Sequence, residues 1–559
     1  SSLHSFGHSS KRRGPTSAPA MPALRRRAPS QVSSSLRFLV AAAVVATAAA
    51  AVAPDGSMHR KFEFALVGVP LSPLHSVVSI GQELCLRGHN VTVLSFGERG
   101  LQKTKKYSPT CELGYVSLGP LPISEEQEHK IISELAKLTN STAAFMKGVA
   151  TQVFGKYFSA LQDAFEKVMA SGAIKPDYAL VSLPFGAVGR ILSDHGVDFA
   201  INMPSAILPP VVPYAAQYIP IPLYTVSLYD MSFVERVSVI ASNVGIHLVK
   251  HAASFVGYKF SFFPDLDPAL WRNRLLLVNS FPGFDYPQAL PPLVQYTGPV
   301  MELRKIEPFP SEVEAFLEAT PPDVPVVYVS FGTVVVLSEE RVAAMVSTLT
   351  SDRYRTLWAL PRAQQIGLPA SLPPSMLVHH WIPTPRALAH PKVTAFVSHC
   401  GGNSAVEAMS WGVPIVGYPQ FGDQPAVCQR IADAGAGRTR PPGCWVQASD
   451  VLEVVSIPAY TAKAQMLSRI FKKFGGVERA ADYLELGARG DLEAIRLPTE
   501  RSWTAWFQLG GYETFVVVAV LALLAMYALS SCCRCFCRFC GRSSHKETEP
   551  TGHTKAKTH

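Results

Sequence analysis

The stretch from His399 to Gln424 gathers side chains suited to binding a polar ligand. It reads HCGGNSAVEAMSWGVPIVGYPQFGDQ, with a histidine and two glycines at its start and an Asp-Gln pair at its end. Its first turn lies between a predicted strand, residues 393–398, and a predicted helix, residues 403–411. Free backbone N–H groups and the helix dipole at such a turn favour an anion, most often a phosphate, and glycines let the backbone approach it closely. The stretch therefore predicts a phosphate-binding turn.

Each of these side chains also has a purely structural explanation. Ser404 and Glu407 fit the S-x-x-E pattern of a capping box at a helix N-terminus. Asp423 fits the capping position of a helix that starts near Gln424. Trp381, which lies upstream in HHWIPTP, is equally typical of a hydrophobic core. Taken singly, each residue is better explained by structure than by ligand binding, so the argument for a site rests on the ordered set.

The elements that must position these residues alternate between apolar strands and helices. Two such runs are separated by a proline-rich stretch without periodicity, residues 281–325. The segments expected to form strands are 61–70, 90–96, 177–184 and 274–281 in the first run, and 324–332, 354–360, 393–398 and 413–419 in the second. This alternation predicts an α/β fold with parallel sheets covered by helices. Two such domains leave a cleft between them, where ligands usually bind.

The net charge of +9 is concentrated at the two ends of the chain. Residues 1–53 hold seven Lys or Arg and no acidic residue, and residues 532–559 carry a net +4. The ends together exceed the total, so the rest of the 559 residues is slightly negative. This distribution argues against nucleic acid as a partner and indicates a membrane.

Both basic ends flank an apolar run. If translation starts at Met21, Arg25–Arg27 precede an apolar run from Phe38 to Ala53, which is typical of a secretory signal peptide; a plastid transit peptide is the alternative. Residues 512–531 are apolar over about the thickness of a bilayer and predict a transmembrane helix. The tail that follows carries five cysteines within Cys532–Cys540, suited to S-palmitoylation, and is expected in the cytosol.

These features predict a type I membrane protein of the endoplasmic reticulum with its body in the lumen. The final KAKTH resembles a dilysine retrieval signal, and Asn90 and Asn140 begin N-x-T sequons for glycosylation. The five cysteines outside the tail leave the disulfide pattern open.

The ordered set of site residues resembles the signature of the UDP-glycosyltransferase family. That signature runs W-x-P, H-C-G-x-N-S-x-x-E, G-V-P and P-x-x-x-D-Q. It stands here at Trp381–Pro383, His399–Glu407, Gly412–Pro414 and Pro419–Gln424. The segments VVYVSFGT, FDYPQALPPLVQYTGPV and GGVERAADYLE also resemble family segments. The resemblance extends from about Lys61 to the tail, is faint between Pro209 and Leu270, and implies a GT-B architecture of two Rossmann-like domains facing a cleft.

The resemblance also implies a role for each donor-side residue. Trp381 stacks on the uracil, and Glu407 accepts hydrogen bonds from the ribose. Asp423 and Gln424 bind hydroxyls of the donor sugar. The residues expected at the diphosphate are His399, Gly401, Asn403, Ser404 and Thr333. Thr384 departs from the family, where many members have Gln. Neither a metal nor a cofactor is expected; the UDP-sugar is a substrate, with UDP-glucose favoured over UDP-glucuronate.

The predicted division of the chain follows from these assignments. It comprises a leader at 1–53, an acceptor-binding domain at 58–280, a linker at 281–325, a UDP-sugar-binding domain at 326–500, a transmembrane helix at 512–531 and a cytosolic tail at 532–559.

The expected catalytic pair departs from the family pattern. Members of the family use a histidine near the first strand as general base and an aspartate from a later strand to orient it. The family spacing, counted back from Arg87, falls on Pro73, and the nearest histidine is His75. The partner position, five residues after Asp177, is Ser182. A serine cannot compensate the charge of an imidazolium as a carboxylate does.

The sequence therefore predicts an inverting transferase that moves a hexosyl group from a UDP-sugar to a hydroxyl of a small, lipophilic acceptor. The apolar stretch Pro209–Gly245 suggests the lipophilic acceptor. The alternative is a non-catalytic UDP-sugar-binding subunit or scaffold that has lost the base pair. The chain carries no G-x-G-x-x-G after its first strand, no P-loop and no G-x-S-x-G elbow, which argues against other enzyme classes.

Overall fold

The computed structural model describes most of the body of the chain. The described residues are 60–138, 148–182, 186–206, 218–220, 226–255, 274–288, 290–301, 306–332, 335–496, 516 and 519–530. The chain divides into two compact units, Ser1–Arg60 and Lys61–His559, and both sheets lie in the second. Some predicted features lie outside the described residues, namely the leader with its start at Met21, the sequon at Asn140, Thr333 and the tail 532–559.

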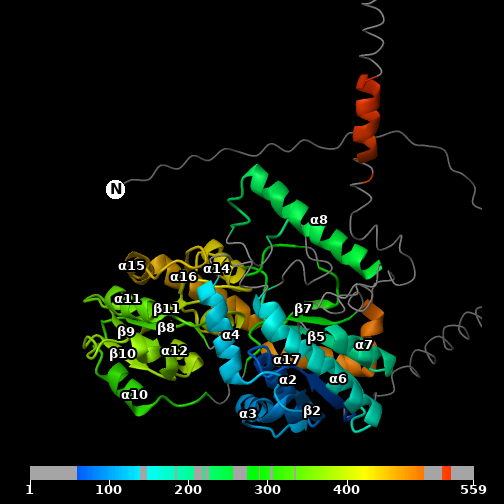
Figure 1. Cartoon of the computed structure of the whole chain (residues 1–559), viewed down its shortest axis with the longest axis horizontal. Coiled ribbons are helices and arrows are strands. Elements are labelled where there is room, and N and C mark those ends of the chain that lie inside the picture. Colours follow the sequence, from blue (N-terminus) through cyan, green and yellow to red (C-terminus); the bar gives the residue numbers. More distant parts are fainter. Residues whose placement is uncertain are drawn as a thin grey trace, which may run out of the picture. The chain divides into compact units, whose positions relative to one another are not determined.

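The first sheet has seven parallel strands among the described residues, in the order β3-β2-β1-β4-β5-β6-β7. Figure 1 labels β2, β5 and β7 of this sheet. They are β1 (Glu63–Val67), β2 (Asn90–Ser95), β3 (Gly114–Ser117), β4 (Tyr178–Ser182), β5 (Asp198–Met203), β6 (Leu276–Val278) and β7 (Val294–Tyr296). Central strands are apolar on both faces: Phe64 and Leu66 of β1 enter one core, and Ala65 and Val67 enter the other. The predicted parallel α/β fold is confirmed in this half.

Helices pack on both faces of the first sheet. On one face lie α2 (Leu74–Leu86) and α17 (Gly476–Arg489), and on the other α6 (Gly155–Ser171) and α7 (Gly186–Asp194). Further helices of this half, among the residues that the structure describes, are α3 (Gly97–Tyr107), α4 (Glu125–Leu138), the π-helix η2 (Ala150–Phe154) and α8 (Phe233–Phe255). The first turn of α8 lies in the stretch expected to serve the acceptor, and it exposes Phe233 and Val234 to solvent.

The second sheet has six parallel strands among the described residues, in the order β10-β9-β8-β11-β12-β13. They are β8 (Val326–Ser330), β9 (Arg355–Ala359), β10 (Met376–His379), β11 (Val393–Ser398), β12 (Ile415–Gly417) and β13 (Gly437–Thr439). Its helices are α10 (Ser311–Glu318), α11 (Glu339–Leu349), α12 (Thr384–Ala389), α13 (Gly402–Trp411), α14 (Gln424–Asp433), α15 (Ala448–Ser456) and α16 (Pro458–Phe471), with short 3-10 turns η3 (Arg362–Gly367) and η4 (Lys472–Phe474). A further 3-10 turn, η5 (Asp491–Ile495), follows α17 and packs on the first sheet through Leu492. The second half is therefore also an α/β layer structure, as predicted.

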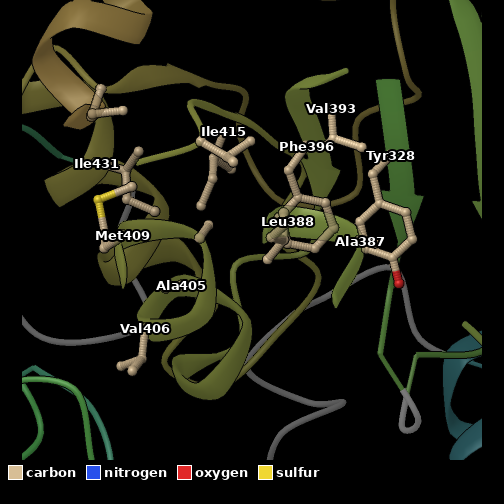
Figure 2. Close-up of a cluster of buried hydrophobic side chains, with 14 of the residues drawn as sticks. Tyr328, Ala387, Leu388, Val393, Phe396, Ala405, Val406, Met409, Ile415 and Ile431 are labelled. Carbon is tan, nitrogen blue, oxygen red and sulfur yellow. The ribbon is translucent and has the colours of Figure 1, made fainter. Parts of the chain in front are cut away.

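A buried cluster fixes the helices that carry the candidate site to this sheet. Tyr328 of β8 stacks on Phe396 of β11 at 5.1 Å between ring centroids. Leu388 of α12, and Ala405 and Met409 of α13, pack in the same cluster (Figure 2). Burying a large apolar side chain stabilises a fold by about 1.5–3 kcal/mol, so the cluster holds α12 and α13 firmly in place.

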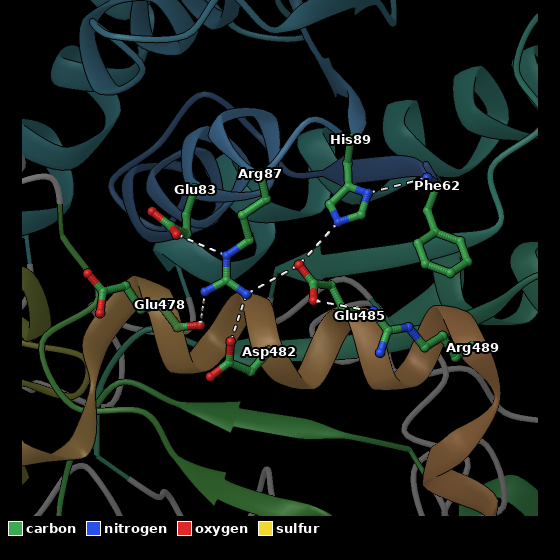
Figure 3. Close-up of polar contacts among 8 residues, drawn as sticks. All are labelled: Phe62, Glu83, Arg87, His89, Glu478, Asp482, Glu485 and Arg489. Carbon is green, nitrogen blue, oxygen red and sulfur yellow. Dashed lines mark hydrogen bonds and ion pairs between the residues drawn. The ribbon is translucent and has the colours of Figure 1, made fainter. Parts of the chain in front are cut away.

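The chain returns to the first sheet after the second is complete. Helix α17 packs on α2, and Arg87 at the end of α2 forms ion pairs with Asp482 at 2.7 Å and Glu485 at 3.2 Å (Figure 3). Arg87 also pairs with Glu83 of its own helix at 2.9 Å. Helix α17 thus ties the two halves of the chain together.

The predicted linker and the predicted transmembrane segment can each be compared with the structure. Residues 281–325, expected as a linker, contain β7, which pairs with β6 of the first sheet, and α10, which carries the buried side chains of Val313 and Leu317. Part of the predicted transmembrane segment, residues 519–530, is helical and exposed. Across the described residues, no helix combines the length and apolar character that a membrane span requires.

Candidate functional site

The predicted phosphate-binding turn lies between β11, which ends at Ser398, and α13, which begins at Gly402. Cys400 adopts a left-handed backbone with φ 61°, and its N–H donates to the Ser398 hydroxyl at 3.1 Å. The helix starts at an N-cap glycine, Gly401, with no side-chain capping bond, so the capping-box explanation for Ser404 and Glu407 is wrong. Because no side chain caps this helix end within the described part of the chain, its first N–H groups can bind a ligand.

His399 packs tightly within the turn. A Cβ at Gly401 would lie 2.5 Å from its Nε2, and a Cβ at Gly332 would lie 2.8 Å from its Cε1. Gly332 precedes Thr333, so the β8–α11 loop lies against this histidine. Burial lowers the pKa of His399 to about 4, which makes the ring neutral at pH 7. Its Nδ1 is buried and lacks a hydrogen-bond partner within the described part of the chain. A ligand oxygen or hydroxyl is the kind of group that would satisfy that nitrogen.

Asn403 reaches the other half of the molecule. Its side-chain amide donates to the Ser72 carbonyl at 3.0 Å, in the loop between β1 and α2. A Cβ at Gly402 would lie 2.7 Å from Cβ of Ser205, which follows β5. The N-terminus of α13 therefore meets the first half within three residues of His75.

Trp381 lies between β10 and α12 and is 45% exposed, so the core explanation for this residue is wrong. Its backbone is held by His379, whose Nδ1 lies 3.2 Å from the Trp381 nitrogen and 2.6 Å from its carbonyl oxygen. Its indole N–H donates to Glu307 at 3.4 Å, and the ammonium of Lys106 lies 4.3 Å from the ring centroid. A fixed backbone and an accessible ring suit a stacking platform.

Glu407 lies in α13 and is buried. Burial raises the pKa of Glu407 to about 8, although Lys106 opposes the shift. Near it, Thr384 and the phenol of Tyr328 share a hydrogen bond of 2.9 Å. Thr384, which departs from the family pattern, is thus hydrogen-bonded to Tyr328 of β8 in the second sheet.

Asp423 and Gln424 lie at the N-terminus of α14. Asp423 occupies the N-cap position and is half-buried, yet its side chain makes no capping bond. Instead its carboxylate accepts a hydrogen bond from Ser205, and desolvation raises its pKa. The side-chain carbonyl of Gln424 accepts from the backbone N–H groups of Gln420 at 2.8 Å and Phe421 at 3.1 Å. The amide N–H groups of Gln424 are therefore what this side chain can offer a sugar hydroxyl.

A disulfide between Cys400 and Cys428 joins the phosphate-binding turn to α14. A second disulfide joins Cys85 at the end of α2 to Cys111, while Cys444 is a free thiol. The first of these links the predicted diphosphate residues to the predicted sugar residues.

The expected catalytic positions lie at the carboxyl ends of β1 and β4. His75 is the second residue of α2, is half-buried and stacks on Tyr107 of α3 with centroids 4.0 Å apart. Burial, and then the charges of Lys103 and Lys106, lower the pKa of His75 to about 3. Ser182 is fully buried at the end of β4 and lies opposite Asn202 of β5 in the sheet register.

Asn202 donates a hydrogen bond to the Ser76 hydroxyl at 2.8 Å, next to His75 in sequence, so an amide lies near the place expected for the carboxylate. Sequence reasoning missed Asn202, Ser205, Lys106 and Glu307. These residues come from segments far apart in the chain, and no local pattern marks them.

Comparisons with known proteins show which family the chain belongs to. A sequence model of the family described as "UDP-glucoronosyl and UDP-glucosyl transferase" matches residues 66–547. The chain belongs to this family. Within the family, it is 25% identical over 446 residues to UDP-glucuronosyltransferase 2A3 of Cavia porcellus, covering 72% of this chain and 80% of that protein. It is 31% identical over 254 residues to UDP-glucuronosyltransferase 2C1 of Oryctolagus cuniculus, covering 44% of this chain and 49% of that protein.

Solved structures show the fold that this UDP-glycosyltransferase shares. The calicheamicin glycosyltransferase CalG4 has a TM-score of 0.53 at 19% identity, covering 77% of this chain and 99% of that one. The glycotransferase of kitacinnamycin has a TM-score of 0.52 at 20% identity, covering 76% and 99%. Two parallel-sheet domains and these neighbours support the GT-B fold, and family membership supports sugar transfer from a UDP-sugar to an acceptor.

Proposed function

We propose that the chain is an inverting glycosyltransferase that moves a hexosyl group from a UDP-sugar to a hydroxyl of a small, lipophilic acceptor. One observation carries the proposal: the N-terminus of α13, whose preceding turn is joined to α14 by the Cys400–Cys428 disulfide, meets the β1–α2 loop through Asn403 and Ser72. This contact puts the proposed donor groups beside the element that carries His75. The donor sugar and the base could then both lie close to one acceptor hydroxyl.

The proposed reaction forms one bond and breaks one. The acceptor oxygen attacks the anomeric carbon as the bond from that carbon to the diphosphate oxygen breaks, and UDP leaves with the bonding electron pair. His75 takes the proton of the acceptor hydroxyl. The N–H groups at the start of α13 stabilise the charge that develops on the diphosphate.

The electrostatics around His75 bear on its role as base. A pKa of about 3 makes the ring a poor proton acceptor at pH 7, because an effective base has a pKa near the working pH. Part of that lowering comes from Lys103 and Lys106. A diphosphate bound nearby offsets both positive charges, so donor binding is expected to raise the pKa of His75 and to make it a better base.

The proposal also covers the donor sugar, the acceptor and the compartment of the chain. We favour UDP-glucose as donor, with UDP-glucuronate as the alternative that the names of the relatives suggest. The exposed apolar residues of α8 support a lipophilic acceptor. The two disulfides suit an oxidising compartment, which supports a body in the lumen of the endoplasmic reticulum.

The alternative is a non-catalytic subunit that binds a UDP-sugar. It is favoured by Ser182, which stands where a carboxylate would stabilise the histidine, and by the low pKa of His75. Both functions need the same donor site and differ only in turnover.

Binding of UDP tests the donor site that both functions share. Base–aromatic stacking contributes roughly 1–3 kcal/mol, so Trp381→Ala should weaken UDP binding by about tenfold or more in titration calorimetry on the full chain. Trp445→Ala is the matched control, because Trp445 is also 45% exposed but stacks on Arg341. Equal UDP affinities in the two variants would remove Trp381 from the site.

A further inference from the structure

Lys106, at the end of α3, covers the ring that is proposed to stack on uracil. Its ammonium lies 4.3 Å from the Trp381 ring centroid and 3.2 Å from a carboxylate oxygen of Glu307. The other oxygen of Glu307 accepts the indole N–H of Trp381 at 3.4 Å. Lysine, carboxylate and indole therefore form a closed set of contacts that joins the first half of the chain to the second.

Lys106 interacts with the proposed site as well as with Trp381. Its charge acts on Glu407, the proposed ribose ligand, and on His75, the proposed base. Its neighbour Tyr107 stacks on His75. Lys106 therefore interacts with groups of both the proposed nucleoside site and the proposed reaction centre. A base that stacks on the face of Trp381 covered by the ammonium has to displace it.

The described donor-side groups offer the diphosphate little positive charge. His399 is neutral at pH 7, Asn403 and Ser404 are uncharged, and Asp423 is acidic. Apart from the N–H groups of α13, counter-charge must come from a cation that reaches the site. A lysine side chain has a flexible stem and can change partner without backbone motion.

We propose that Lys106 is a donor-contacting residue supplied by the first half of the chain. Its ammonium competes with the uracil for the face of Trp381, and once displaced it turns toward the diphosphate as a counter-charge. The inference rests on the proposed function, since it assumes that UDP stacks on Trp381. The consequence is selectivity for the charged nucleotide. Uridine has to displace the ammonium and offers it no new partner, whereas UDP offers it the diphosphate.

Calorimetric titration of the full chain with uridine and with UDP tests this competition. Lys106→Met keeps the stem and removes the charge. Uridine should then bind about two- to fivefold more tightly, because a cation–π contact of that strength no longer competes. UDP should gain less or lose affinity, so the preference for UDP over uridine should fall. Lys105→Met, one residue away, exposed and on the same helix, removes the same charge and should change neither affinity.

The outcomes separate this inference from the function on which it rests. If Trp381→Ala weakens UDP binding but Lys106→Met leaves the UDP-to-uridine preference as in Lys105→Met, the donor site stands and the role of Lys106 is overturned. Weaker uridine binding in Lys106→Met also overturns it, because the lysine would then be a support of the ring. If Trp381→Ala leaves UDP binding unchanged, the proposed function fails first.

Discussion

Burial drives two side chains of the proposed site, one acidic and one basic, toward the neutral form. It raises the pKa of Glu407 to about 8 and lowers the pKa of His75 to about 3, so neither carries a full charge at pH 7. A neutral carboxyl can both donate and accept hydrogen bonds, which suits a pair of ribose hydroxyls. A neutral imidazole is the form that a general base requires. The low dielectric that keeps both groups neutral also strengthens their interaction with a bound diphosphate.

The raised pKa of Glu407 makes stability depend on pH in a defined direction. Folding favours the protonated carboxyl, so its contribution to stability is complete below pH 4.5 and is lost as the pH rises through about 8. In Glu407→Gln that loss is absent. The melting temperature of the wild type should therefore fall relative to Glu407→Gln between pH 5 and pH 8, measured by thermal unfolding of both proteins. Melting temperatures that change in parallel would show that Glu407 ionises normally in the folded chain.

At the scale of elements, the unit β11–turn–α13–β12–turn–α14 could be predicted closely from sequence. Its strand and helix periods are local, and α13 was expected over 403–411 and runs from Gly402 to Trp411. What could not be predicted depends on contacts between distant segments. The contact of Lys106 with Trp381 joins α3 to the β10–α12 loop, and β7 is a strand of three residues whose pairing only the sheet reveals. The roles of Asp423 and Gln424 in binding the donor sugar stay predictions from resemblance; Asp423 lies beside Ser205 of the first half.

The Cys400–Cys428 disulfide should matter for binding beyond stability. It holds the turn in which Cys400 has φ 61°, a conformation that costs a non-glycine residue about 1 kcal/mol or more. Cys428→Ser should relax that turn and weaken UDP binding by about fivefold, which corresponds to roughly 1 kcal/mol. Calorimetry on the purified chain would measure it.

Cys85→Ser is the control for that change, because it breaks the disulfide at the end of α2, far in sequence from the turn. It should lower the melting temperature without changing UDP affinity. Equal losses of affinity in the two variants would mean that both disulfides act only through global stability.

At the scale of the whole molecule, each half supplies what the other lacks. The second sheet carries the proposed donor groups, and the first carries His75 and, by inference, the cation Lys106. Helix α17 returns to the first sheet and is held there by Arg87, so the two halves fold as one connected unit (Figure 3). The proposed catalysis depends on His75, which lies outside both the donor site and the family signature at Trp381–Gln424.

Sugar transfer by the wild type and by His75→Ala is the most direct test of the proposed glycosyltransferase mechanism. UDP-glucose and UDP-glucuronate would be offered with a panel of lipid alcohols, and product formation, anomeric configuration and UDP affinity would be recorded. If His75 is the base, the product should have inverted configuration, and His75→Ala should lose ~10²–10⁴-fold in turnover with UDP affinity unchanged. Turnover equal to wild type in His75→Ala would show that the base lies elsewhere. Absence of transfer from every donor tested, in both the wild type and Ser182→Asp, would contradict the proposal of an active transferase and leave the UDP-sugar-binding subunit.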